Sequence, residues 1–152
     1  MARYTQQERL AKKLAECRRI AERLSVDALQ SPSEVAEYMQ ALLAGAEQEE
    51  LWVILLDTRL RPIAASQVYK GSLNTSLVRV GELFREAIRK NAASLILFHN
   101  HPSGNPMPSP EDASLTSAAV RAGKLLDIPV LDHIIVGSAG YVSLKASGQM
   151  EA

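Results

Sequence analysis

Two short apolar runs limit the folds that this chain can adopt. The segments 51–56 (LWVILL) and 94–98 (SLILF) hold apolar residues without regular polar alternation. This pattern is typical of strands buried on both faces, and such strands need helices to cover them. Each run is far shorter than the roughly 20 apolar residues of a membrane-spanning helix. The sequence therefore predicts a covered sheet and no membrane partner.

Helical and strand patterns alternate along the rest of the chain, which indicates an α/β fold with a mixed β-sheet flanked by helices. Helices are predicted where apolar residues recur at spacings of three and four. The predicted helices cover 1–25, 31–43, 82–91 and 110–126, and the predicted strands cover 51–56, 63–69, 76–80, 94–98, 130–136 and 141–144. The residues 137–140 are expected to form a hairpin turn.

The chain divides into an N-terminal amphipathic helix over 1–30, one α/β domain over 31–146 and a polar tail over 147–152. The first helix has a narrow apolar stripe, and acidic residues are interspersed among its basic ones. This composition favours a helix that docks on the domain or on a second subunit over an arm for nucleic acid or a membrane surface. A homodimer through this helix is therefore one expectation.

Charge and cysteine content exclude some classes of function. The 17 basic residues balance the 17 acidic ones, so the global charge argues for no polyanionic partner. Cys17 is the only cysteine, which rules out an internal disulfide and a zinc site built from cysteines. A chain of this kind suits a reducing compartment, and we expect a cytoplasmic protein.

The segment 99–112 (HNHPSGNPMPSPED) carries the clearest sign of chemistry. His99 and His101 end a predicted strand, where residues i and i+2 lie on the same side, so both imidazoles can converge on one point. The Pro- and Gly-rich loop can return Asp112, in the first turn of the next helix, to that point. Two imidazoles and a carboxylate suit zinc, and three protein ligands with one open position are typical of catalytic zinc.

Ser109, Pro110 and Asp112 also match a simpler pattern, the start of a helix. A serine cap, a proline at the first helical position and an acidic residue at the third form a variant of the capping box. A capping role does not exclude a role in a site, because the cap fixes the direction in which a ligand of the first turn points.

Taken together, these residues spell His-x-His-Pro followed by Ser-x-x-Asp, and the segment resembles the metal-binding motif of the JAMM (JAB1/MPN/Mov34) metalloprotease family. The similarity is greatest to the RadC branch, through HNHPSG at 99–104, PSPED at 108–112, LDHIIVG at 131–137 and EELWVILLD at 49–57. The resemblance covers roughly residues 32–146. It implies a JAB1/MPN-like, cytidine-deaminase-like sandwich with an extra N-terminal helix.

The resemblance implies a zinc-dependent metallohydrolase that cleaves a peptide or isopeptide bond in a protein or peptide substrate. His99, His101 and Asp112 would hold one Zn²⁺ ion per chain. The ion lowers the pKa of its bound water toward about 7, and this water attacks the amide carbonyl.

A hydrolase of this kind also needs a general base. In the family the base is a glutamate near the start of the strand after the first helix, and the RadC-like pattern places Glu49 there. Glu50 is the alternative, because neighbouring residues of a strand point to opposite faces and only one of the two can reach the site. By resemblance, Ser109 would help to hold the water or the oxyanion.

Two alternatives to catalysis stay open. One is a non-catalytic zinc-containing module in DNA repair or mobile-element biology that binds DNA or protein. The other is an interaction domain whose motif is structural only. RadC-like proteins usually carry helix-hairpin-helix elements before this domain, and residues 1–30 show no Gly-rich hairpin between two helices. This difference weakens the expectation of direct DNA binding.

His133 is the third histidine of the chain, next to Asp132 in a predicted strand. RadC-like sequences share this Asp-His pair. The histidine is either a group that orients a metal ligand or a buried side chain that is hydrogen-bonded within the sheet.

Overall fold

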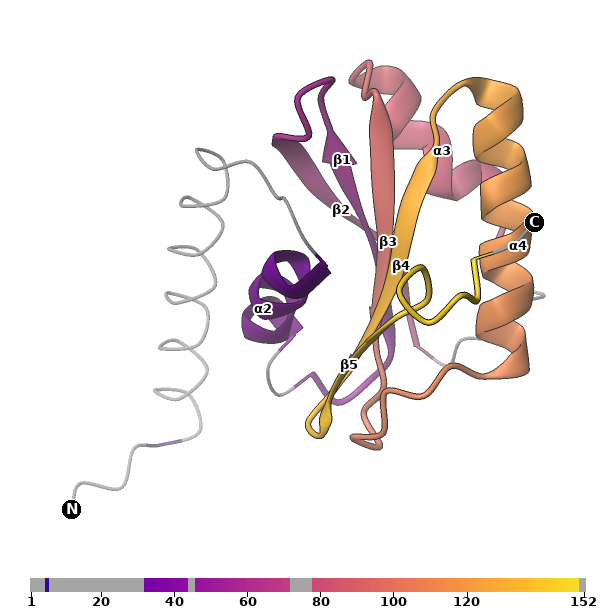
Figure 1. Cartoon of the computed structure of the whole chain (residues 1–152). Helices are drawn as coiled ribbons and strands as arrows, with labels where there is room; N and C mark the ends of the chain where they lie inside the picture. The colour runs from indigo at the N-terminus through magenta and orange to yellow at the C-terminus, as the bar shows by residue number, and fades with distance from the viewer. Residues whose placement is uncertain (1–4, 6–31, 44–45, 72–77, 151–152) are drawn as a thin grey trace.

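The computed structural model of the chain describes residues 5, 32–43, 46–71 and 78–150. Its sheet has five strands in the order β2-β1-β3-β4-β5 (Figure 1). The strands are β1 (Glu50–Leu56), β2 (Pro62–Lys70), β3 (Ser94–Asn100), β4 (Val130–Gly137) and β5 (Gly140–Ser143), and the described helices are α2 (Pro32–Leu43), α3 (Val80–Arg89) and α4 (Pro110–Leu126). The helix predicted over 1–30 lies outside the described residues, apart from residue 5.

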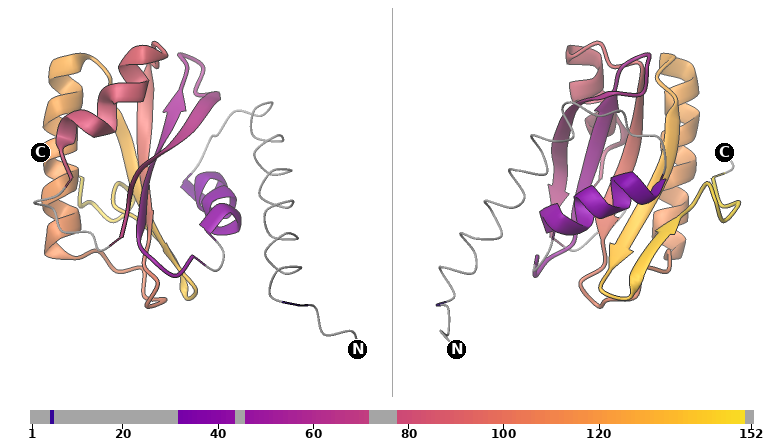
Figure 2. Two further views of the ribbon diagram at one scale, coloured as in Figure 1. Left: turned by 180° about the vertical axis from the view of Figure 1, so that it is seen from behind. Right: turned by 60° about the vertical axis from the view of Figure 1, so that its left-hand side comes forward.

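The sheet is mixed, as predicted. β1 pairs antiparallel with β2 and β3, β4 pairs antiparallel with β5, and β3 runs parallel to β4. Helix α2 covers one face of the sheet, and α3 and α4 cover the other (Figure 2). β3 lies at the centre, and all seven of its residues are buried. The predicted α/β class and the sheet covered on both faces are therefore confirmed.

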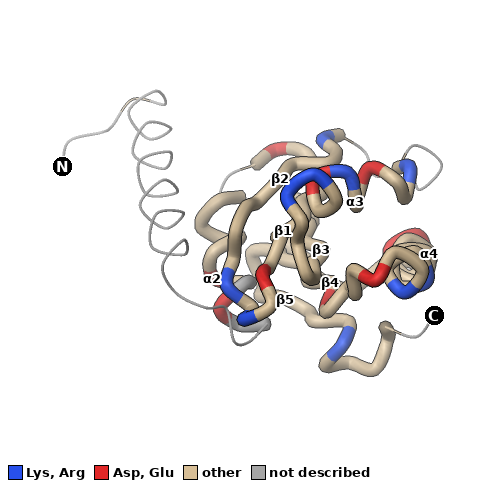
Figure 3. The backbone as a smooth tube through the Cα atoms, turned by 90° about the horizontal axis from the view of Figure 1, so that it is seen from above, with Lys and Arg blue, Asp and Glu red and all other residues tan. Residues whose placement is uncertain are grey.

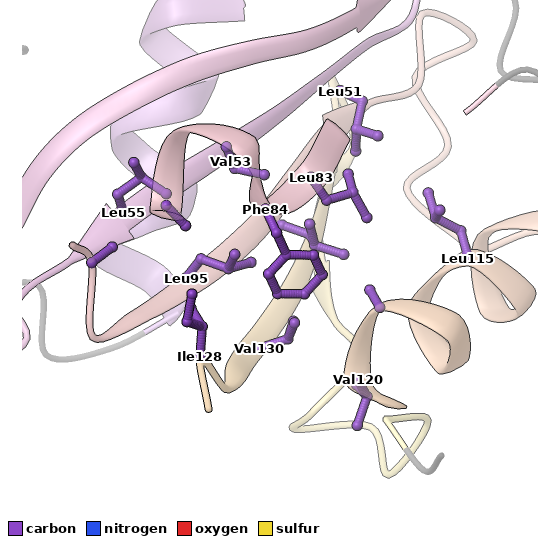
Figure 4. Packing of buried hydrophobic residues seen from close by; sticks show 14 of the residues in the cluster. Leu51, Val53, Leu55, Leu83, Phe84, Leu95, Leu115, Val120, Ile128 and Val130 are labelled. Carbon is purple, nitrogen blue, oxygen red and sulfur yellow. The ribbon is translucent and has the colours of Figure 1, made fainter. Parts of the chain in front are cut away.

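Alternate residues of the central strands pack against the two helical layers. The α3/α4 face carries the larger apolar cluster, which Figure 4 shows around Phe84. From the sheet this cluster takes Leu51, Val53, Leu55, Leu95, Leu97 and Val130. The second cluster, on the α2 face, takes Ile54, Leu56, Ile96, Phe98, Ile134 and Val136 from the sheet. Because the faces alternate, the position of each residue along its strand decides which helical layer it meets.

The prediction of a strand over 76–80 is wrong for the residues of this segment that the structure describes. Val78 and Arg79 belong to no strand, and α3 begins at Val80, two residues before the predicted start. Val78 is buried in the cluster of the α3/α4 face, so its apolar side chain serves packing at the entry to the helix. Residues 76 and 77 lie outside the described part of the chain.

The loop after β3 is held against the β4–β5 turn by close backbone contacts. The His101 N–H donates to the Val136 carbonyl (2.7 Å), and the Ala139 N–H donates to the Gly104 carbonyl (3.1 Å). Gly104 has a φ of +93°, and a Cβ added at Gly137 would lie 2.3 Å from the Gly104 carbonyl oxygen. The position of His101 therefore depends on two residues that lack a side chain.

We expect Gly137→Ala to push this loop away from β4 and to lower the free energy of unfolding by about 1–3 kcal/mol, the usual cost of overpacking. Urea or thermal unfolding of the purified variant measures the loss. Gly81→Ala is the matched control, because a Cβ there meets nothing within 4 Å and alanine is the better helix former. Wild-type stability of Gly137→Ala would show that the backbone contact is not tight.

Candidate metal centre

His99 and His101 lie where β3 ends. The strand continues to Asn100, because Leu51 of β1 still pairs with His99 and Val136 of β4 still pairs with Asn100. The alternation of the strand directs His99 to the α3/α4 face, and His101 follows directly after the strand. The two Nε2 atoms lie 2.9 Å apart. The imidazoles converge, as their spacing in the sequence predicted.

Asp112 reaches the histidines from the first turn of α4. The predicted capping box is present: the Ser109 Oγ accepts from the Asp112 N–H (3.1 Å), and the Ser109 N–H donates to Asp112 Oδ2 (2.8 Å). The carboxylate then meets the strand end, with Oδ1 at 3.3 Å from His99 Nε2 and Oδ2 at 3.2 Å from His101 Nε2. His99 and Asp112 are buried, and His101 is partly exposed.

The donor atoms of His99, His101 and Asp112 form a group that could hold a metal ion. Around a tetrahedral zinc ion with bonds of about 2.0–2.2 Å, neighbouring ligand atoms lie about 3.3–3.6 Å apart. In the structure the two imidazole nitrogens lie 2.9 Å apart, the distances of 3.3 and 3.2 Å run to the two different oxygens of Asp112, and the donor atoms of the three residues all lie within 4.8 Å of one another. Imidazole and carboxylate donors suit zinc and also iron or manganese. The residues therefore fit one such ion, and three protein donors leave a position for water or substrate.

The electrostatics of the group favour an ionised carboxylate. Burial by itself raises the pKa of Asp112, but hydrogen bonds to His101 and His99 outweigh it and hold this pKa far below its usual range. The hydrogen bond to Asp112 raises the pKa of His101, against the effect of burial, and the Asn105 carbonyl and the charge of Glu49 raise it further. A metal ion would therefore meet a carboxylate ready to bind and would compete with protons for His101.

The structure separates the two candidate bases. Glu50 is tied to β2: its Oε1 accepts from Gln67 Nε2 (2.8 Å) and lies 3.7 Å from Lys70 Nζ. Neighbouring residues of an extended chain point to opposite faces, so Glu49 points away from these partners. Its negative charge is among the causes that raise the pKa of His101. The contacts of Glu50 with β2 favour Glu49 as the member of the pair that serves the site, and this choice and the role of Glu49 as a base stay predictions.

Thr116 is a neighbour of the site that the sequence analysis missed. The Nδ1 of His99 lies 2.7 Å from the Nε2 of His133, and the Nδ1 of His133 lies 2.6 Å from Thr116 Oγ1. Burial lowers the pKa of His133 well below the ordinary value. Thr116 follows Asp112 by four residues, which puts both on one face of α4. That spacing is the signal that could have identified it.

A bulge in β4 brings His133 to the same side of the sheet as the other two histidines. Val130 pairs with Leu95, whereas Asp132 pairs with the next residue of β3, so Leu131 is an extra residue. Because side chains alternate along a strand, one extra residue reverses the face of every residue that follows. Without the bulge, His133 would lie on the α2 face.

The two perturbed histidines should give the metal-free protein opposite pH dependences. The pKa of His133 is lowered in the folded state, so stability is lost as the pH falls below the ordinary histidine value of about 6.5. The pKa of His101 is raised, so its contribution is complete below that value and is lost as the pH rises through the folded-state pKa.

Urea unfolding in EDTA between about pH 5 and 8 measures both contributions. His133→Gln is expected to flatten the acidic side of the stability profile, and His101→Gln the alkaline side. A His133→Gln profile parallel to the wild type below about pH 6.5 would contradict a buried, neutral His133.

Comparison with known proteins identifies relatives of this domain. The sequence model of the RadC-like JAB domain matches residues 29–149. UPF0758 proteins of Roseiflexus castenholzii and Chloroflexus aurantiacus are each 50% identical to the chain over 120 residues, and one of Bacillus cereus is 43% identical over 122 residues. These matches cover 79–80% of this chain and 52–54% of the relatives, so the chain spans about half of their length. The matched region contains both the strand end with its histidines and the capped helix, and the chain belongs to the RadC-like JAB domain family.

Proposed function

We propose that this chain is a zinc-dependent hydrolase that cleaves a peptide or isopeptide bond in a protein or peptide substrate. One observation carries the proposal: the donor atoms of His99, His101 and Asp112 converge, all within 4.8 Å of one another. The charge of Glu49 also acts on this group. Three protein donors with a nearby carboxylate are the composition of a hydrolytic zinc centre, whereas structural centres use four protein donors.

His99, His101 and Asp112 would hold the zinc ion, whose chemistry when bound would be to activate a water and to polarise the carbonyl of the scissile bond. His99 and His101 donate through imidazole nitrogens, so Asp112 brings the only negative charge among the three ligands. His99 and Asp112 are buried, and the exposed edge of the centre is formed by His101 and the loop after it. The substrate therefore approaches over the loop 103–108, where Ser103 and Met107 are exposed.

Glu49 and Ser109 have separate tasks in this proposal. The Glu49 carboxylate takes a proton from the attacking water and passes it to the leaving amine as the C–N bond breaks. The Ser109 Oγ accepts from the Asp112 N–H through a lone pair, so its hydroxyl hydrogen can donate to the oxyanion that develops on the carbonyl. The capping box of α4 thus holds the ligand Asp112 and the hydroxyl donor of Ser109 next to each other.

The described surface supports a protein or peptide substrate over DNA. Lys and Arg are interspersed with Asp and Glu (Figure 3), and Arg61, Arg85 and Arg89 form ion pairs with carboxylates at 2.8, 4.0 and 3.0 Å. A DNA-binding face presents clustered positive charge instead. Within the described ranges, no helix has the length and apolar character of a membrane span. Homodimerisation through residues 1–30 and a cytoplasmic location stay part of the proposal.

Metal content tests the first half of the proposal. Elemental analysis is expected to find about one zinc per wild-type chain and little or none in Asp112→Asn, because the neutral amide removes the charged ligand. Asp57→Asn is the control: it removes a carboxylate that accepts from the backbone N–H groups of Arg59 and Arg61 in the β1–β2 turn, and it should keep its zinc. A wild-type chain without metal after dialysis against zinc would end the hydrolase proposal.

Measurements of hydrolysis test the second part of the proposal, which is catalysis with Glu49 as the general base. Glu49→Gln keeps the size of the side chain but cannot take a proton, so hydrolysis is expected to fall by about 10²–10⁴-fold while zinc stays bound. Glu50→Gln makes the same change one residue further and should keep wild-type activity. The substrates are quenched-fluorescent peptides and a peptide with an isopeptide-linked lysine.

Full activity of Glu49→Gln would remove Glu49 as the base. A zinc-loaded wild type that cleaves neither substrate, and that binds DNA with an affinity that falls with salt, would instead favour the non-catalytic module.

A further inference from the structure

A continuous series of buried hydrogen bonds connects two of the candidate ligands, His99 and Asp112, through His133 and Thr116. It runs from His99 Nδ1 to His133 Nε2 (2.7 Å), from His133 Nδ1 to Thr116 Oγ1 (2.6 Å) and from Thr116 Oγ1 to the Asp112 main-chain oxygen (2.7 Å). The exposed fractions of His99, His133 and Thr116 are 1%, 0% and 0%. This chain of hydrogen bonds therefore begins on one ligand residue and ends on another, without access to water.

The chemistry of the groups sets the direction of every proton in this chain. The Asp112 carbonyl can only accept, so the single hydroxyl hydrogen of Thr116 is committed to it. Thr116 Oγ1 must then accept from the N–H at His133 Nδ1. A neutral imidazole carries one N–H, so His133 Nε2 accepts, and the N–H that it accepts belongs to His99 Nδ1. The Nδ1 of His99 is thereby occupied by its proton, and Nε2, which faces Asp112 and His101, is the atom left to bind a metal ion.

We propose that Thr116 and His133 are positioning residues that hold His99 in the tautomer able to bind metal, with the proton on Nδ1 and the lone pair on Nε2. This inference rests on the metal-binding part of the proposed function. His101 obtains the same arrangement from the Asn105 carbonyl, which accepts at 2.9 Å from Nδ1. Both histidines thus have an acceptor for Nδ1–H and direct Nε2 at the Asp112 carboxylate.

The location of His99 explains why it needs two side chains for this purpose. β3 pairs with β1 on one edge and with β4 on the other, so the backbone carbonyls around His99 are engaged in the hydrogen bonds of the sheet. His101 lies beyond the strand and meets a loop carbonyl, whereas His99 lies inside the strand and faces the α3/α4 layer. An acceptor there has to come from a side chain, and the bulge at Leu131 delivers the His133 ring to that place.

Zinc affinity, measured by competition with a chromophoric chelator, tests the inference. Thr116→Val keeps the shape of the side chain but removes the hydroxyl, so His133 Nδ1 loses its acceptor and the tautomer is released. We expect the affinity to fall by about 10–100-fold, as for other groups behind metal ligands. Thr116→Ser restores the hydroxyl and should bind zinc close to the wild-type value.

Val120→Ala is the matched control for lost packing. Val120 lies one turn further along α4, in the apolar cluster, and has no part in the hydrogen-bond chain. This variant should unfold at a lower temperature than the wild type, as Thr116→Val does, and should keep its zinc affinity. Thermal unfolding in EDTA and circular dichroism establish that each variant is folded under the assay conditions.

The tautomers themselves can be observed by ¹⁵N NMR of the histidine rings in the metal-free protein. The wild type should show His99 protonated on Nδ1, whether or not Nε2 also carries a proton toward Asp112, and Thr116→Val should show a mixture of the two tautomers. A wild-type His99 without a proton on Nδ1, or equal zinc affinities of the wild type and Thr116→Val, would overturn this inference alone. A wild type that binds no zinc would overturn the proposed function, and the NMR measurement would still decide the tautomer.

Discussion

The contacts of the Asp112 carboxylate hold together the two parts of the site, the start of α4 and the end of β3. The carboxylate accepts from the Ser109 N–H at the start of α4 and lies against His99 and His101 at the end of β3. With only 5% of the residue exposed, losing these partners would leave a buried charge without compensation, which costs far more than a broken surface ion pair. The same carboxylate oxygens therefore hold the helix, the strand and the candidate metal centre in one arrangement.

The remainder of the fold supplies a rigid base for this group. β3 is apolar and buried from Leu95 to Phe98, with a paired strand on each edge and a helical layer on each face. A histidine at the end of such a strand has little freedom to move, because its backbone is fixed on both sides. The loop that carries His101 is tied to the β4–β5 turn through Gly104 and Gly137. Rigid support of this kind keeps ligand atoms at the separations that a metal ion requires.

Local rules made most of the fold and site predictable. The two unalternating apolar runs became the neighbouring strands β1 and β3, and the Ser109 cap became the capping box of α4. The failure at 76–80 has a local cause as well: a short segment with Val78 and Val80 has the composition of a strand, and only its packing against the core shows that it leads into a helix. The helix expected over 1–30 falls outside the described residues, and the domain limits at 31 and 146 stay predictions.

The sequence by itself was sufficient for the strand-end pair of His99 and His101, for the first-turn position of Asp112 and for the choice of zinc-type donors. Each of these follows from strand alternation or from helix capping, which act over a few residues. Only the tertiary structure decided that His133 meets His99 and that Thr116 completes the chain behind them. That outcome depends on one extra residue in β4. A single bulge reverses the faces of a strand, and its presence is settled by pairing between residues that lie 35 or 36 positions apart in the chain.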